Sequence, residues 1–140
     1  MKALELAKYV LNRCIDDDYP ISNLQLQKIL YYIQKKYLQE IGKSAFEDEI
    51  EAWQFGPVVS SVYSSFCGFG GNPIFICPKT DEVKDEMKII IDPVIYSKRV
   101  MNPWDLVRET HEEGKAWSLI YKNGSGEHKV IPKKLIQEKG

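Results

Sequence analysis

The sequence contains 140 residues, of which 44% are hydrophobic and 28% are charged, a balance typical of one soluble domain that buries its own core. Its formal net charge of −1 at pH 7 argues against a general affinity for nucleic acid or anionic lipid. No run approaches the roughly 20 apolar residues that cross a bilayer, and residues 1–14 lack the apolar stretch of a secretion signal, so we expect a cytoplasmic protein with no membrane partner.

The cysteines show neither a disulfide framework nor a metal site. Cys14, Cys67 and Cys77 cannot all pair within one chain, and their spacing does not match that of zinc ligands. We expect three reduced thiols and neither a metal nor a cofactor. Residues 16–18 are three adjacent aspartates, but calcium loops place their ligands at alternate positions around a turn glycine, so a solvated loop is expected.

The clearest predicted element is a central helix over residues 22–41, preceded by an amphipathic helix over residues 2–16. Ser22 and Gln25 form a Ser-x-x-Gln capping box, and Gly42 occupies the position of a left-handed C-terminal cap. Apolar side chains fall on two rows of this helix, which indicates neighbours on more than one side. A narrow strip is left for water, formed by Gln25, Lys28, Lys35, Lys36 and Gln39. These patterns predict a mainly α fold, a single compact domain around the central helix with at most a small β element.

The segment after the central helix is punctuated by carboxylates, glycines and a proline. Residues 47–51 carry four acidic side chains in a short exposed run, where solubility or partner contact is expected rather than acid–base chemistry. Residues 50–55 predict a short strand or an irregular extended piece. A helix is predicted to begin at Pro57, which suits the first helical position, and to end at the glycines of residues 68–71. No Lys-Ser/Thr pair follows these glycines, so they predict a turn rather than a phosphate loop.

The chain between residues 74 and 100 leaves two interpretations open. Residues 74–77 predict a short strand bounded by prolines. Residues 89–91 are three isoleucines that favour extended backbone, after which Asp92 and Pro93 would open a short helix. The alternative is one longer helix that starts at Thr80 and is kinked at Pro93.

The last third of the chain predicts three short helices. The first opens at Asn102-Pro103 and carries Trp104 and His111 on one face. The second begins at residue 116, and the third opens at Pro132.

His111 is the best-placed ionisable side chain, because its helical face lies between Trp104 and Trp117. It could act as a general base, but a histidine at such a position is more often a core residue bonded to a backbone carbonyl. Residues 111–113 do not match the His-Glu-x-x-His of metalloproteases, and no serine or cysteine has the surroundings of an activated nucleophile. The lysines within residues 28–43 could contact phosphates, yet a solvated face is the favoured interpretation, and nucleic acid is not expected as a partner.

Three sequence blocks resemble, in order and spacing, the Panacea domain, a family also described as phage-associated GepA-like and SocA-like. They are residues 26–34 (LQKILYYIQ), residues 52–59 (AWQFGPVV) with Tyr63, and residues 110–114 (THEEG) with Trp117. The resemblance covers nearly the whole chain and implies one mostly helical domain over residues 1–140 that is the antitoxin of a toxin–antitoxin pair. Family members often carry a longer regular helix before the Thr-His block, a region that the isoleucines and proline of residues 89–93 would disturb here.

The partner that the resemblance implies is a cognate protein toxin, bound directly. A relative acts as an adaptor that delivers its toxin to a ClpXP-type protease; this role, an enzyme that uses His111, and DNA binding are the alternatives. The family supplies no catalytic residues, and no accessory DNA-binding domain is expected. The motif positions that could contact the partner, or could instead determine the fold, are Trp53, Phe55, Pro57, Tyr63, His111 and Trp117.

Overall fold

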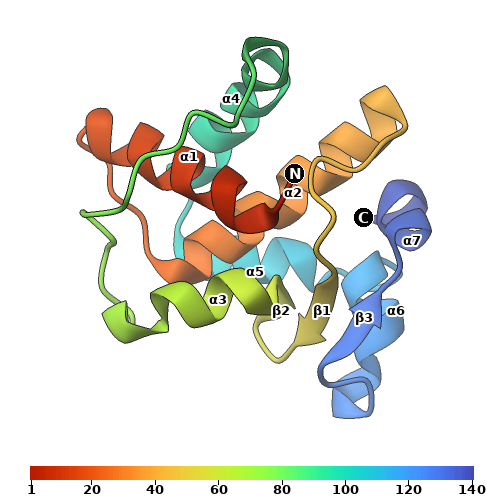
Figure 1. The fold of residues 1–140 in the computed structure, drawn as a ribbon. Coiled ribbons are helices and arrows are strands. Elements are labelled where there is room, and N and C mark those ends of the chain that lie inside the picture. The colour runs from red at the N-terminus through yellow and green to blue at the C-terminus, as the bar shows by residue number, and fades with distance from the viewer.

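Seven α-helices and a three-stranded antiparallel sheet make up the fold of residues 1–140, all of which the computed structural model describes (Figure 1). The helices are α1 (Ala3–Asp16), α2 (Asn23–Ile41), α3 (Ser60–Phe66), α4 (Asp85–Arg99), α5 (Pro103–Thr110), α6 (Ala116–Tyr121) and α7 (Lys133–Lys139). The strands are β1 (Ile50–Trp53), β2 (Gly56–Val58) and β3 (Lys129–Ile131). The predicted mainly α fold with a small β element is confirmed.

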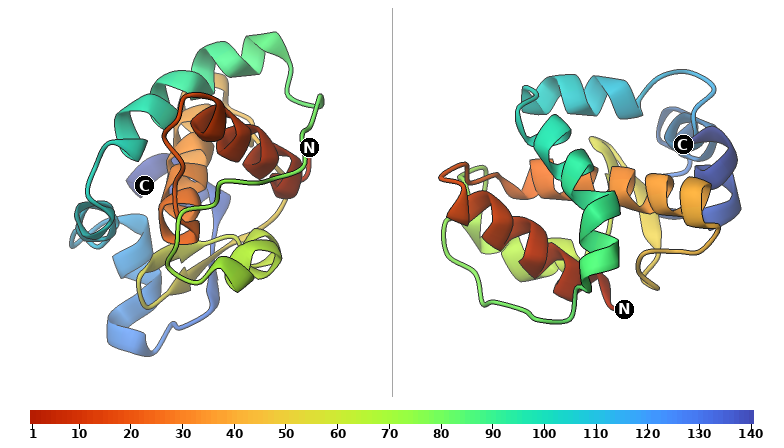
Figure 2. Two further views of the ribbon diagram at one scale, coloured as in Figure 1. Left: turned by 90° about the vertical axis from the view of Figure 1, so that its left-hand side faces the viewer. Right: turned by 90° about the horizontal axis from the view of Figure 1, so that it is seen from above.

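Helix α2 is the element around which the others pack. Its start has the predicted capping box, in which the Ser22 hydroxyl accepts from the Gln25 N–H and the Gln25 side chain accepts from the Ser22 N–H at 2.9 Å. Its end is capped by Gly42 in the left-handed region, with φ 79°. Helices α1, α3, α4, α5 and α7 all contact it, and Figure 2 shows α1 and α3 on one side of α2 and α5 on the other. This arrangement explains why α2 carries two apolar rows.

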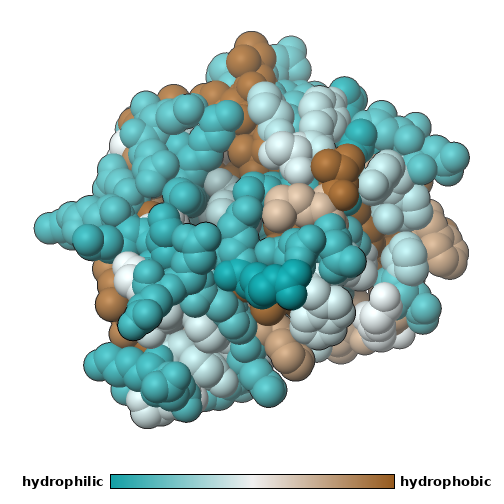
Figure 3. Space-filling view, turned by 180° about the vertical axis from the view of Figure 1, so that it is seen from behind, coloured by the Kyte–Doolittle hydropathy of each residue, from teal (hydrophilic) through white to brown (hydrophobic).

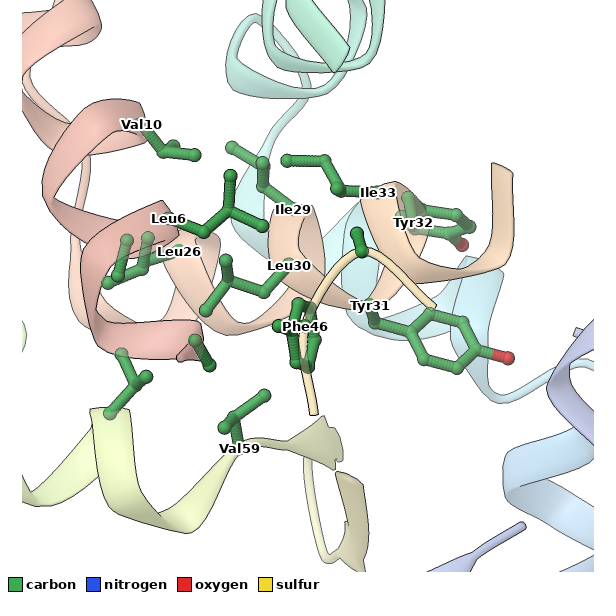
Figure 4. Close-up of a cluster of buried hydrophobic side chains, with 14 of the residues drawn as sticks. Leu6, Val10, Leu26, Ile29, Leu30, Tyr31, Tyr32, Ile33, Phe46 and Val59 are labelled. Atoms are coloured by element: carbon green, nitrogen blue, oxygen red, sulfur yellow. The ribbon is translucent and has the colours of Figure 1, made fainter. Parts of the chain in front are cut away.

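The core fills the space between α2, α1 and the first strands (Figure 4). Its fully buried side chains include Leu6 and Val10 of α1, Leu30 and Ile33 of α2, and Phe46 from the loop after α2. Truncating a leucine in such a core to alanine removes about 2–5 kcal/mol of stability, so this cluster is the main reason for the α1–α2 arrangement.

The sheet corrects the predicted start of α3. Its order is β2-β1-β3, and Ala52 at its centre pairs with Pro57 on one side and Lys129 on the other. Pro57 was expected to open a helix, but it lies in the edge strand β2, where its missing N–H leaves no ladder bond unmade. Helix α3 therefore begins at Ser60. The two residues of the β1–β2 turn are Gln54 and Phe55.

The segment from residue 74 to 100 resolves the two interpretations in favour of the single helix, although α4 begins at Asp85 rather than Thr80. Pro93 lies inside this helix, whereas Ile91 and Ile95 are buried. Packing against α2 thus outweighs the extended preference of the isoleucines and the bond lost at the proline. The region before the Thr-His block is consequently a regular helix. Of the strand predicted at residues 74–77, only an isolated bridge between Ile74 and Ile21 forms.

Candidate functional site

Aromatic side chains gather around the tip of the β1–β2 turn. Phe55 is 48% exposed and Trp104 of α5 is 53% exposed, and their ring centroids lie 5.5 Å apart in an edge-to-face pair. The ring of Trp53 lies 5.0 Å from that of Tyr63 on α3. These residues border a groove of about 360 Å³, which we name the aromatic groove. Its apolar and aromatic lining consists of Leu24, Trp53, Phe55, Val58, Tyr63 and Trp104.

Amide side chains of α2 fix the wall of the aromatic groove. Gln27 accepts from the backbone N–H of Val59 at 2.9 Å and donates to the side chain of Asn23 at 3.0 Å. Asn23 in turn donates to the backbone carbonyl of Tyr63 at 3.3 Å. Both amides are buried, and together they attach the end of β2 and the helix α3 to α2.

Lys28 lies beneath the groove, which corrects its predicted place on a wet strip of α2. Its side chain is 0% exposed, and its Nζ donates to the backbone carbonyl of Pro57 at 3.1 Å. Burial lowers the pKa of Lys28 to about 7, and no carboxylate offsets this effect. The helical pattern could not reveal this burial, because the turn that covers Lys28 comes from a distant part of the chain.

Gly56 makes this close approach of the turn to α2 possible. Its φ is +113°, and a Cβ atom there would lie 2.7 Å from Cε of Lys28 and 2.8 Å from Oγ1 of Thr110. The Thr110 hydroxyl itself donates to the carbonyl of Val107 at 2.8 Å. We name the contact of Lys28, Gly56, Pro57 and Thr110 the turn joint. It joins α2, the β1–β2 turn and the end of α5.

A second aromatic group lies beyond the turn joint. The rings of His111 and Trp117 stack with centroids 3.7 Å apart, and Trp117 stacks on Tyr121 at 4.5 Å. The indole N–H of Trp117 donates to the carbonyl of Trp53 at 2.8 Å, which connects α6 to β1. This bond gives Trp117, only 7% exposed, a clear structural role.

His111 is held by stacking, whereas the sequence favoured a hydrogen bond to a backbone carbonyl. It caps the end of α5, and its Nε2 is buried without a partner. Burial lowers the pKa of His111, and the nearby charge of Lys28 lowers it further, so the ring is neutral at pH 7. A neutral ring with a stacked face and no nucleophile bonded to it has the surroundings of a packing residue.

The acidic run of residues 47–51 is partly internal. Asp48 accepts from the N–H of Ala3 at 2.8 Å and from the hydroxyl of Ser61 at 2.8 Å. Burial raises the pKa of Asp48, but these hydrogen bonds outweigh that effect and the pKa lies below its usual value. Asp48 therefore ties the start of α1 to α3 instead of standing free at the surface.

The structure divides the six motif positions into two groups. Trp53, Phe55 and Tyr63 meet at the aromatic groove, and the Pro57 carbonyl lies below it in the turn joint. His111 and Trp117 form the separate stack between α5 and α6. Sequence reasoning missed two lining residues, Leu24 and Trp104. Trp104 was expected on an apolar face with His111, and nothing in the sequence connects it to the turn that it contacts.

No three side chains of the metal-ligating types lie together, and the three cysteines are free thiols. None of the helices combines the length and the apolar character needed to span a bilayer.

Comparison with known proteins places the chain in a family. The model of the SocA-like antitoxin, Panacea domain family matches residues 26–118. The chain belongs to this family. It is 31% identical over 136 residues to Antitoxin SocA of Caulobacter vibrioides (strain NA1000 / CB15N), an alignment that covers 89% of this chain and 72% of that protein. No solved structure gave a significant match.

The three blocks that resemble the Panacea domain meet in space. Lys28 comes from the first block, Gly56 and Pro57 from the second, and Thr110 from the third, and these four residues form the turn joint. Several motif positions of this Panacea domain therefore determine how the turn is held against α2 and α5. The aromatic residues around the turn are left at the surface, where they border the groove.

Proposed function

We propose that this Panacea domain is an antitoxin that neutralises a cognate protein toxin by binding it directly through the aromatic groove. Membership in an antitoxin family supports a toxin as the partner. The observation that carries the choice of surface is the exposed pair of Phe55 and Trp104 beside the groove. Tryptophan and tyrosine are enriched among the residues that dominate protein–protein binding energy, and solvent-exposed aromatic clusters mark such surfaces.

The groove is suited to this role because its walls are already ordered. The Gln27 and Asn23 hydrogen bonds hold one wall, and the turn joint holds the Phe55 turn from below. A surface fixed in this way loses little conformational entropy on binding. Polar side chains around the groove, such as Gln54 and Glu127, would form the rim of the contact.

The first test is growth rescue. The chain is co-expressed with the product of the neighbouring gene, under conditions in which that product alone arrests growth. We expect rescue by the unchanged chain and by Phe75→Ala, a matched exposed phenylalanine outside the groove, but not by Phe55→Ala or Trp104→Ala. Soluble expression of every variant is checked by immunoblot. Persistent toxicity with the unchanged, soluble chain would contradict the proposal.

Two alternatives predict different results in the same cells. Delivery of the toxin to a ClpXP-type protease predicts that the toxin disappears in a pulse-chase, whereas direct neutralisation predicts a stable complex that can be purified. An enzyme that uses His111 predicts that His111→Asn abolishes rescue while leaving thermal stability unchanged. The stacked ring predicts that this variant loses stability first.

A further inference from the structure

A second pocket, of about 390 Å³, opens between α2, α4 and α5, and it shares no lining residue with the aromatic groove. Helix α5 lies behind α2 in the view of Figure 1, as the two views of Figure 2 show. The side chains on that face of the molecule are mainly hydrophilic (Figure 3). Because lysines dominate its charged lining, we name this hollow the basic pocket.

The basic pocket has a surplus of positive charge. Four lysines and two glutamates line it, in a chain whose formal net charge is −1. Lys98 of α4 pairs with Glu109 of α5 at 2.5 Å. Lys35 and Lys36 of α2 and Lys115 before α6 make no ion pair with a carboxylate of the chain. Their charge is therefore left for a ligand to neutralise.

The ammonium groups lie close enough to act on one another. Burial lowers the pKa of Lys35, and the charges of Lys115 and Lys98 lower it further. Nζ of Lys98 lies 4.1 Å from the ring centroid of Tyr32, and Nζ of Lys35 lies 5.8 Å from the same centroid. Like charges gathered around one ring repel, and an anion between them would convert this repulsion into attraction.

Tyr31 adds a neutral donor to the wall of the pocket. Its side chain is only 2% exposed, and its hydroxyl points away from the apolar cluster (Figure 4). Burial raises the pKa of this phenol, so the hydroxyl keeps its proton and can donate to an anion.

We propose that the basic pocket binds a small molecule that carries a phosphate or pyrophosphate group. Lysine ammonium groups are strong point-charge partners of phosphate oxygens, and three different segments of the chain bring them to one place. The volume of about 390 Å³ lies within the roughly 300–1,000 Å³ of small-molecule sites. The site goes beyond toxin binding, because its lining is separate from that of the aromatic groove.

The test is isothermal titration of pyrophosphate, inorganic phosphate and ADP into the purified chain, with sulfate as the comparison anion and the ionic strength held constant. We expect saturable binding of pyrophosphate or ADP with a Kd below about 1 mM. Lys35→Gln combined with Lys115→Gln should weaken it by about tenfold or more. The control pair is Lys43→Gln with Lys129→Gln, which changes the net charge equally at exposed positions outside the pocket and should leave the Kd within about twofold.

Tyr31→Phe provides a second variant that removes one hydroxyl and leaves every charge in place, should the double variant fail to fold. Weakened phosphate binding by this variant, with an unchanged melting curve, supports the proposal. No saturable binding to the unchanged chain, equal affinity for sulfate, or an equal loss in the control pair would overturn it.

Discussion

Lys28 provides the most demanding physical test of the structure, because its burial gives stability a specific pH dependence. The pKa of Lys28 is lowered from 10.5 to about 7 in the folded chain. Between these two pH values the unfolded chain binds a proton that the folded chain lacks, so stability rises as the pH increases through this window. The linkage relation gives a gain of about 2 kcal/mol between pH 7 and pH 9 from this one group.

Lys28→Met keeps most of the aliphatic volume and removes the titration. Its free energy of unfolding, measured by urea denaturation, should lack this gain of about 2 kcal/mol between pH 7 and pH 9 relative to the unchanged chain. At pH 7 the variant avoids the cost of a buried charge, which offsets the roughly 1–3 kcal/mol of an unpaired Pro57 carbonyl. It should therefore be no less stable than the unchanged chain there. Lys43→Met, a change at an exposed lysine, is the matched control and should keep the full pH dependence. Equal pH dependence in Lys28→Met and the unchanged chain would refute the burial of this amine.

Two further predictions concern the same region. Gly56→Ala places a methyl group against Lys28 and Thr110 at a φ of +113°, and should lose at least about 1 kcal/mol more stability than Gly42→Ala, whose added Cβ meets nothing within 4 Å. Equal losses in urea denaturation would show that the turn is not pressed against α2. Trp117→Phe removes the bond to the Trp53 carbonyl and should cost about 1–3 kcal/mol, together with faster amide exchange in β1. Unchanged exchange there would contradict the link between α6 and β1.

The sequence predicted best where a local interaction decides the structure. The capping box at Ser22 and the left-handed glycine at residue 42 define both ends of α2 without any help from the rest of the chain. The two apolar rows of α2 then implied its central place. Pro57 was misplaced because the same residue suits the start of a helix and the edge of a sheet, and only pairing with Ala52 selects between them.

The candidate site was only half predicted, because its remaining features depend on contacts between distant segments. Trp53, Phe55 and Tyr63 are close in sequence and were found as a group, whereas Trp104 enters from α5. Lys28 occupies a helical position that neighbouring polar residues marked as wet, and the turn over it decides otherwise. The basic pocket escaped for a similar reason, since Lys98 and Lys115 are supplied by later parts of the chain.

The central claim is that the aromatic groove binds the toxin, and the dissociation constant of the purified complex tests it most directly. Titration of the toxin with the Phe55→Ala and Phe75→Ala variants compares two exposed phenylalanines, one inside the groove and one outside it. The proposal predicts a Kd raised about 30-fold or more by Phe55→Ala, which corresponds to about 2 kcal/mol, and a Kd within about twofold of the unchanged chain for Phe75→Ala. Toxin binding that Phe55→Ala leaves unaltered would contradict it.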